Sequence, residues 1–418
     1  SQQAVALASL AAIYLLGGTG LERRRGTTRA FLAPLYAVAH LVALVAVVWG
    51  MEPAVKRLLT AGTWPRAACL WAVGGQLILA AAYVLFAWFR AQERWAHIAA
   101  WLGVMAAGLA ISAFEQGQGW SALAVALLAA VYVLAERALA AGVLRFRRPP
   151  AGAAIEAAWP LFRRPLLVAG WAMSAGAVLL ALGHNLVLLG GGRESSAWAI
   201  AALLAVTTLY ALAAWIFRRR LFLWLAGGLA IAPWTLLAAW GWFLWAAPPP
   251  LPRYALSWAV LACIELGTGL VLTASWKVLV ERGTEGQDYG FPLRVVANLL
   301  LPVALVWGAV DPATSSLIWG LGLAFYLVSA VADHRRGLAG WRGARFLYPS
   351  VVAVLVWPVY LLHHLVPTAP YEVYGLLMLG LSLPLLAGGR VLQRFDRARS
   401  LPLYLGAYGA AIAGTALV

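Results

Sequence analysis

Fourteen stretches of about 20 mostly apolar residues run through this chain, and each is long enough to cross a lipid bilayer as a helix. Of its 418 residues, 63% are hydrophobic and 11% are charged, whereas a soluble domain has roughly 45–50% apolar and about 25% charged residues. Most of the surface must therefore face lipid rather than water. The predicted spans are 3–20, 31–50, 66–89, 96–114, 120–140, 166–190, 196–217, 221–246, 254–275, 292–310, 315–332, 346–366, 371–389 and 401–418.

Two kinds of connection alternate between these spans. One kind is basic, as in "LERRRGTTR", "RRR" and "DHRRGLAGWRGAR", and the other is rich in Gly, Pro or Ser, as in "GGGRESS" and "AAPPPLPRY". The helices after the basic turns open alike, with "AFLAPLYAV", "LFLWLAGGL" and "RFLYPSVVAV". From residue 196 on, the first helices of successive pairs begin about 58 residues apart, as expected of a repeat architecture.

The alternation predicts an all-α polytopic membrane protein with about 14 transmembrane helices, built from tandem helical hairpins. We expect one transmembrane domain over residues 1–418. Because the chain opens "SQQAVALASL" without a methionine, we also expect it to be part of a longer or processed polypeptide. The seven predicted hairpins are 3–50, 66–114, 120–190, 196–246, 254–310, 315–366 and 371–418.

The net charge of +16 is concentrated in the basic turns, which hold 26 of the 31 Lys and Arg residues. Such a bias over short loops places the basic side in the cytoplasm and both ends of the chain outside. We therefore expect a multi-pass protein of a prokaryotic cytoplasmic (inner) membrane. A nucleic-acid partner is not expected, because the basic residues lie in short clusters between apolar runs and do not cover a polar face.

Polar side chains within the spans are the candidate functional groups, because they are costly in hydrocarbon. Glu265 in "LACIELGTGL" is the one carboxylate deep in an apolar run, and it fits either a proton or cation site or a structural bond to a neighbouring helix. Gln76 and Asn298 fit interhelical hydrogen bonds best, and Asn185 is a further polar candidate within an apolar helix.

Histidines within the spans raise the question of a cofactor. His40 and His184 are weak candidates, because a neutral imidazole can ligate haem iron or chlorin magnesium, but no facing partner is visible. The two cysteines, Cys69 and Cys263, lie in separate apolar runs, without the spacing of a zinc or covalent haem site. We predict no catalytic residues, no metal and no cofactor.

Bound lipids are expected instead. Arginine clusters beside a membrane attract anionic headgroups, and the candidate headgroup residues are Arg218, Arg219, Arg220, Arg335 and Arg336. The 22 tryptophans, many of them near span ends, fit interface anchors. The expected partners are membrane lipids and other membrane subunits.

Three functions remain open. The first is a non-catalytic scaffold, accessory subunit or lipid-organising element. The second is a transporter or flippase of an amphipathic or lipid-linked substrate, which would need a polar cavity reaching the midplane. The third is a membrane glycosyltransferase-like enzyme, although the outer loops carry only single, unpaired acids.

Overall fold

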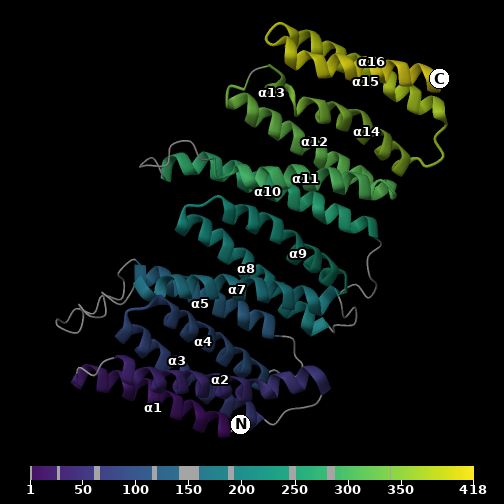
Figure 1. Cartoon of the computed structure of the whole chain (residues 1–418). Helices are drawn as coiled ribbons and strands as arrows, with labels where there is room; N and C mark the ends of the chain where they lie inside the picture. Colours follow the sequence, from purple (N-terminus) through teal and green to yellow (C-terminus); the bar gives the residue numbers. More distant parts are fainter. Residues whose placement is uncertain are drawn as a thin grey trace. The chain divides into compact units, whose positions relative to one another are not determined.

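The computed structural model describes residues 2–25, 29–60, 66–114, 120–140, 160–186, 193–243, 251–279, 288–338 and 340–418, and Figure 1 shows their helices. These helices are α1 (Gln2–Arg25), α2 (Arg29–Thr60), α3 (Arg66–Arg90), α4 (Glu93–Phe114), α5 (Ser121–Ala140), α7 (Pro160–Leu186), α8 (Arg193–Phe217), α9 (Leu221–Phe243), α10 (Leu251–Leu279), α11 (Phe291–Gly308), α12 (Pro312–Arg335), α13 (Gly340–Ala344), α14 (Leu347–Leu365), α15 (Tyr371–Gln393) and α16 (Arg397–Leu417).

Fourteen spans within the described residues are long and apolar enough to cross a membrane, which confirms the predicted number. The largest difference in length concerns α2. The sequence predicted a span ending at residue 50, but the helix continues to Thr60 through "MEPAVKRLLT". Hydropathy marks only the part of a helix that is apolar, and the charged extension beyond it lacked that signal.

The chain divides into two compact units, which are described separately. Unit 1 is Ser1–Leu209 and unit 2 is Tyr210–Val418. The boundary falls inside α8, so it follows no linker, and a single domain of seven tandem repeats stays a prediction.

In unit 1 the helices of three predicted hairpins pack together, namely α1 with α2, α3 with α4 and α5 with α7. In unit 2 the same holds for α10 with α11, α12 with α14 and α15 with α16.

Two of the short basic turns begin with the same backbone conformation. Ala91 follows α3 with a φ of 51°, and Arg218 follows α8 with a φ of 52°. A left-handed residue directly after a helix end is a common way to terminate the helix and reverse the chain. The turn after α12 uses Gly337 instead, with a φ of 71°.

Small residues bring paired helices into close contact. A Cβ on Gly375 of α15 would lie 2.9 Å from the carbonyl oxygen of Gly414 on α16, and a Cβ on Gly414 would lie 2.8 Å from that of Gly375. A Cβ on Gly290 would overlap the carbonyl oxygen of Gly269 on α10. Because helices in lipid associate through close packing more than through the hydrophobic effect, such contacts hold the hairpins together.

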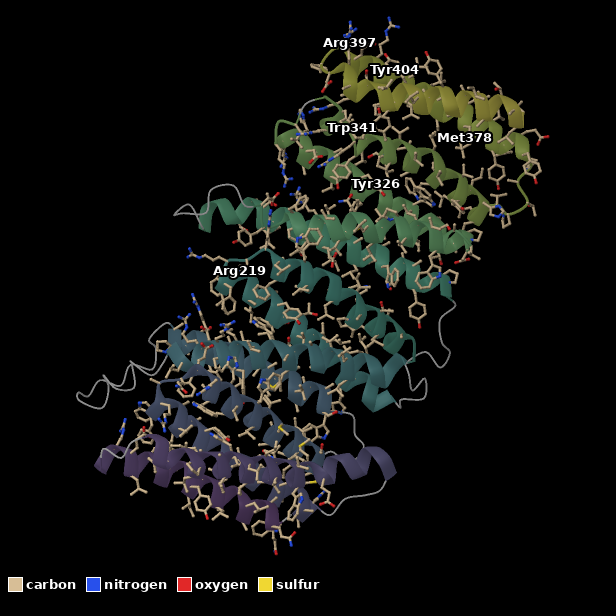
Figure 2. The ribbon with its side chains drawn as sticks, viewed as in Figure 1. Arg219, Tyr326, Trp341, Met378, Arg397 and Tyr404 are labelled. Atoms are coloured by element: carbon tan, nitrogen blue, oxygen red, sulfur yellow. The ribbon has the colours of Figure 1, made fainter. Side chains whose placement is uncertain are left out.

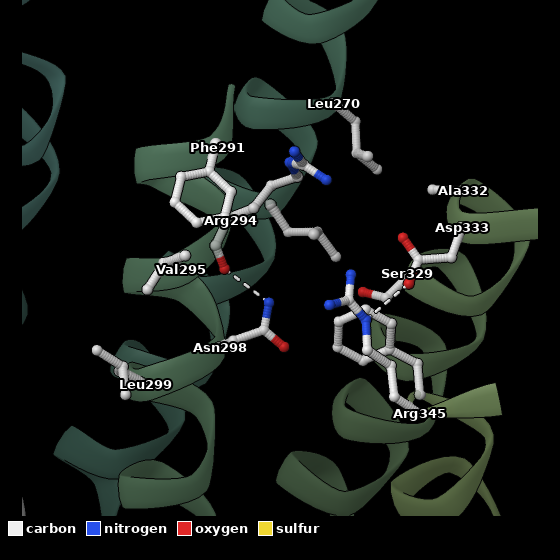
Figure 3. A pocket seen from close by; sticks show the side chains of 12 residues that line it. Leu270, Phe291, Arg294, Val295, Asn298, Leu299, Ser329, Ala332, Asp333 and Arg345 are labelled. Atoms are coloured by element: carbon white, nitrogen blue, oxygen red, sulfur yellow. Dashed lines mark hydrogen bonds and ion pairs between the residues drawn. The ribbon is translucent and has the colours of Figure 1, made fainter. Parts of the chain in front are cut away.

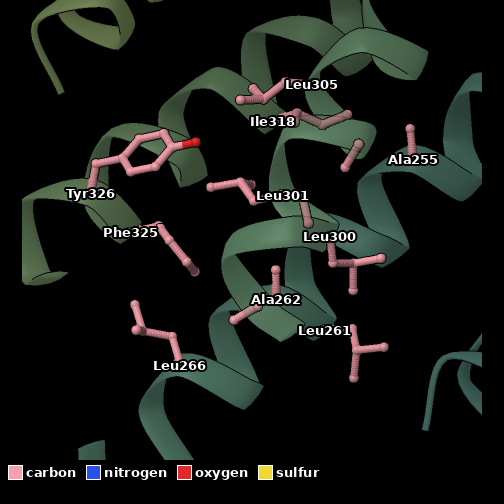
Figure 4. Packing of buried hydrophobic residues seen from close by; sticks show 13 residues of the cluster. Ala255, Leu261, Ala262, Leu266, Leu300, Leu301, Leu305, Ile318, Phe325 and Tyr326 are labelled. Carbon is pink, nitrogen blue, oxygen red and sulfur yellow. The ribbon is translucent and has the colours of Figure 1, made fainter. Parts of the chain in front are cut away.

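Each unit has its own packed interior. In unit 1, Leu15 of α1, Ala43 of α2 and Leu79 of α3 belong to one buried cluster. In unit 2, α10, α11 and α12 meet in a second cluster that includes Leu301 and Ile318 (Figure 4). This second cluster runs along the middle of α10, α11 and α12, and Leu266 in it also lines the cavity described below.

Partly or fully buried acids pair with arginines at the basic turns. In unit 1, Oε2 of Glu22 lies 2.6 Å from a terminal nitrogen of Arg90, and Oε1 of Glu136 accepts a 2.9 Å bond from Nε of Arg163. Within unit 2, Figure 2 shows Arg219 and Arg397 at the helix ends where the basic turns lie, away from Met378. The turns are therefore partly neutralised, even though the chain as a whole is strongly basic.

Candidate functional site

A cavity of about 300 Å³ lies in unit 2 at the end of the helices that carries the basic turns (Figure 3). It is formed by α10, α11, α12 and the residues directly before α14. Its lining combines two arginines, one aspartate, one serine and one asparagine with an apolar wall. The lining residues are Leu266, Leu270, Phe291, Arg294, Val295, Asn298, Leu299, Ser329, Ala332, Asp333, Arg345 and Phe346.

Arg294 enters the cavity from the first turn of α11 and is held by Asp288. One guanidinium nitrogen of Arg294 is ion-paired with Oδ2 of Asp288. The other carboxylate oxygen accepts bonds from the Thr273 hydroxyl at 2.7 Å and from the Gly290 backbone N–H at 3.1 Å. Asp288 therefore fixes the position of the arginine. The Arg294 side chain is only 12% exposed.

Arg345 reaches the cavity from the opposite side, across the turn between α12 and α14. Its Nε donates to Oδ2 of Asp333 at 2.9 Å, and its guanidinium lies 4.7 Å from the centroid of the Phe346 ring. Asp333 is buried near the end of α12. Its pairing with Arg345 joins the end of α12 to the residues before α14 and places a second ion pair beside the cavity.

Two hydrogen-bond donors in the cavity have no acceptor among the described residues. They are the hydroxyl of Ser329, whose residue is 3% exposed, and Nε of Arg294. Buried donors are costly when they are unpaired. Asn298 also lines the cavity, but its amide donates to the Arg294 carbonyl of its own helix at 2.6 Å. The cavity wall therefore contains two buried donors whose hydrogen bonds are not met by the described residues.

An apolar stripe leads away from the cavity along α11. Leu299, Val303 and Val306 are 65%, 50% and 78% exposed, and their spacing of four and then three residues places them on one helix face. Leu299 also belongs to the cavity wall. Through Leu299, the apolar wall of the cavity thus continues into an exposed apolar surface that suits a hydrocarbon chain.

Glu265 does not line this cavity. It is 5% exposed, and among the described residues neither carboxylate oxygen has a hydrogen-bond partner. A Cβ on Gly227 would lie 3.6 Å from its Oε1, close to where the same Cβ would meet Leu293 and Val296. Glu265, on α10, is thus enclosed by residues of α9 and α11. A structural role predicted a hydrogen bond to a neighbouring helix, and the described residues provide none.

Of the other polar candidates whose side chains the structure describes, Asn298 lines the cavity, and His40 and Gln76 belong to unit 1. His40 accepts or donates a 2.8 Å bond with Tyr83 through Nδ1, and its ring stacks on Trp95 with centroids 4.6 Å apart. Gln76 is buried in unit 1 beside Gly50, and its Oε1 has no partner among the described residues. The side chains of His184 and Asn185 lie outside the described residues.

The predicted headgroup arginines are exposed at the turns of unit 2. Arg218, Arg219 and Arg220 are exposed together, and the Arg218 carbonyl accepts a 2.5 Å bond from the Tyr289 hydroxyl. Burial raises the pKa of the Tyr289 hydroxyl, while the charges of Arg218 and Arg220 act to lower it. Arg335 and Arg336 are exposed after α12.

Sequence reasoning did not single out the residues that form the cavity's polar end. Arg294 and Arg345 were counted only as topology signals, and Asp288, Asp333 and Ser329 were not considered. A usable signal existed, because Glu22, Glu136 and Asp333 each stand near the end of the first helix of a hairpin, within a basic segment. An isolated acid at such a position suggests a fixed ion pair.

No protein-family model, curated protein or solved structure matches this chain. The class of protein therefore rests on the fold. Fourteen helices long and apolar enough to cross a membrane, within the described residues, indicate a multi-pass membrane protein.

Proposed function

We propose that this protein is a lipid-organising scaffold or accessory subunit of a prokaryotic cytoplasmic membrane, and that the unit 2 cavity holds a phospholipid. The basic turns face the cytoplasm in this proposal, as the charge bias predicts. The lipid headgroup lies against Arg294, Arg345 and Ser329, and one acyl chain follows the stripe of Leu299, Val303 and Val306.

The observation that carries the proposal is the pair of unpaired buried donors at the edge of an apolar cavity. Phosphate oxygens are strong acceptors, and arginine is suited to them because its planar guanidinium presents several N–H groups. The apolar wall and the exposed stripe suit the rest of an amphipathic molecule. A free, fully polar anion would leave this apolar surface without a partner.

The packed cluster of α10, α11 and α12 supports binding in place over passage through unit 2. Leu301, Ile318 and Phe325 belong to this buried cluster, and Leu266 belongs both to the cluster and to the cavity lining. A transporter or flippase is the second candidate, and the buried, unpaired carboxyl of Glu265 favours it. Intramembrane acids commonly mark proton or substrate paths.

Lipid analysis of the purified protein tests the proposal. Protein extracted in mild detergent is analysed for retained phospholipid by native mass spectrometry, with Ala332→Phe as the test variant, because Ala332 lines the cavity. Val331→Phe is the matched control, since Val331 is 51% exposed on the same helix and does not line the cavity. We expect lipid on the wild type and the control and its loss from Ala332→Phe.

Equal lipid retention by all three proteins contradicts the proposed site. Proteoliposomes then separate the two candidate functions. A lipid-organising protein leaves the transbilayer movement of a fluorescent phospholipid unchanged, whereas a flippase accelerates it and Glu265→Gln abolishes the acceleration.

A further inference from the structure

We infer that the unit 2 cavity selects a zwitterionic phospholipid whose headgroup carries both a phosphate and a primary ammonium, the phosphoethanolamine type. The inference rests on the proposed function, because it names the class of lipid that the same cavity takes.

The charges around the cavity are balanced, although the chain as a whole is strongly basic. Arg294 is paired with Asp288 and Arg345 is paired with Asp333, so the site presents two positive and two negative groups. An anionic headgroup would add an uncompensated negative charge to a site where interactions are weakly screened. A zwitterionic headgroup leaves the site neutral, which lowers the cost of burial.

The cavity lining holds donors for one half of such a headgroup and an acceptor for the other. Nε of Arg294 and the Ser329 hydroxyl are donors without partners among the described residues, and they suit phosphate oxygens. Asp333 lines the same cavity as an acceptor, one helical turn after Ser329 on α12. In Figure 3, the side chains of Ser329 and Asp333 lie on one side of the cavity and that of Arg294 lies opposite.

Hydrogen-bonding capacity separates the ammonium types. A primary ammonium carries three N–H donors and can bond the Asp333 carboxylate while Arg345 keeps its own bond to Oδ2. A trimethylammonium group has no N–H donor and a larger radius. It therefore attracts the carboxylate by its charge but donates no hydrogen bond to it. A phosphoglycerol headgroup brings hydroxyls but no positive charge. The cavity should therefore rank phosphoethanolamine first.

The test is a competition in the intact chain. Wild-type protein is reconstituted in nanodiscs of equal parts phosphatidylethanolamine, phosphatidylglycerol and phosphatidylcholine with identical acyl chains, then released into detergent, and retained lipids are counted by native mass spectrometry. We expect phosphatidylethanolamine to be enriched roughly tenfold over either competitor, the effect of one charge-assisted hydrogen bond. Enrichment of phosphatidylglycerol, or equal retention of the ethanolamine and choline lipids, overturns the inference.

Two variants assign the selectivity to the cavity. Asp333→Asn should bring phosphatidylethanolamine down to the level of phosphatidylcholine, whereas Ser329→Ala should reduce both lipids together because it removes a phosphate contact. Glu372→Gln is the charge-matched control, since Glu372 is an exposed acid in the first turn of α15. Unchanged selectivity in Asp333→Asn contradicts the inference. Retention of no lipid by the wild type contradicts the proposed function itself, and this outcome is distinct from a wrong headgroup order.

Discussion

The carboxylate of Glu136 is buried near the end of α5 and depends on Arg163 of α7 for a 2.9 Å ion pair. The Arg163 side chain is half exposed, whereas Glu136 is 1% exposed. The two residues lie on either side of residues 141–159, so their bond joins the two helices of one predicted hairpin. Loss of the arginine would leave a buried carboxylate without the ion pair that the described residues provide.

Arg163→Gln should therefore lower the free energy of unfolding by about 1–3 kcal/mol, the cost of an unsatisfied buried group. The measurement is an unfolding titration in mixed detergent micelles. Arg164→Gln is the control, because Arg164 is 78% exposed, and it should change stability by no more than about 0.5 kcal/mol. The double variant Glu136→Gln with Arg163→Gln should recover most of the loss, and purely additive losses would show that the pair is not coupled.

Gly290→Ala should destabilise the contact between α10 and α11. A methyl group at this position would overlap the carbonyl oxygen of Gly269 and the Thr273 hydroxyl. Overpacking against backbone costs about 1–3 kcal/mol or more, because backbone cannot rotate away. The thermal unfolding midpoint in detergent is the measurement.

Gly267→Ala provides the matched control for this contact. Gly267 lies on α10, and a Cβ there would meet nothing within 4 Å. Alanine has a higher helix propensity than glycine, so this variant should be neutral or more stable by up to about 1 kcal/mol. Destabilisation of equal size in both variants would contradict the packing seen between α10 and α11.

Glu265→Leu should be close to neutral for stability, or stabilising. The carboxyl has no hydrogen-bond partner among the described residues, so an apolar side chain of similar size removes a buried polar group without breaking a bond. Glu265→Gln should change the free energy of unfolding by less than about 1 kcal/mol. A loss above about 2 kcal/mol in the leucine variant would mean that the carboxyl has a partner after all.

Cysteine accessibility should report the proposed orientation. Single cysteines at Arg336 and Arg397 lie at the basic end of unit 2, and those at Ala309 and Thr368 lie at the opposite end; all four positions are exposed. In cells, with Cys69 and Cys263 replaced by serine, an impermeant maleimide should label Ala309→Cys and Thr368→Cys only. Arg336→Cys and Arg397→Cys should react after permeabilisation. The reverse pattern would invert the orientation.

The spans were predictable from sequence because hydrocarbon thickness sets their length directly. The α2 extension was not, since the apolar run ends by Glu52 while the helix continues through Lys56 and Arg57. Helix pairing was predictable where a short basic turn keeps consecutive helices adjacent, as between α3 and α4, whereas α5 and α7 pack together although 19 residues separate them. The fourth hairpin, 196–246, remains a prediction, because the unit boundary divides α8.

The cavity was beyond sequence reasoning because its polar groups come from separate turns. Arg294 and Arg335 look alike in a count of basic residues, yet Arg294 is buried beside Asp288 and Arg335 is exposed. Whether an arginine side chain contacts an acid, a lipid or water depends on how its helix is rotated about its own axis. The spacing of apolar residues in the sequence defines that rotation only approximately. For Glu265, the sequence predicted burial, but it did not predict that the carboxyl has no hydrogen-bond partner among the described residues.

The exposed arginines after α12 would also couple this hairpin to the membrane potential. Arg335, Arg336 and Arg342 are exposed, whereas Arg345 is neutralised by Asp333. In the proposed orientation, inverting the hairpin would move these three exposed charges against an inside-negative potential. At 100 mV that would cost roughly 7 kcal/mol. In that orientation an energised membrane would resist inversion of this hairpin during synthesis, and a dissipated potential would remove that part of the barrier.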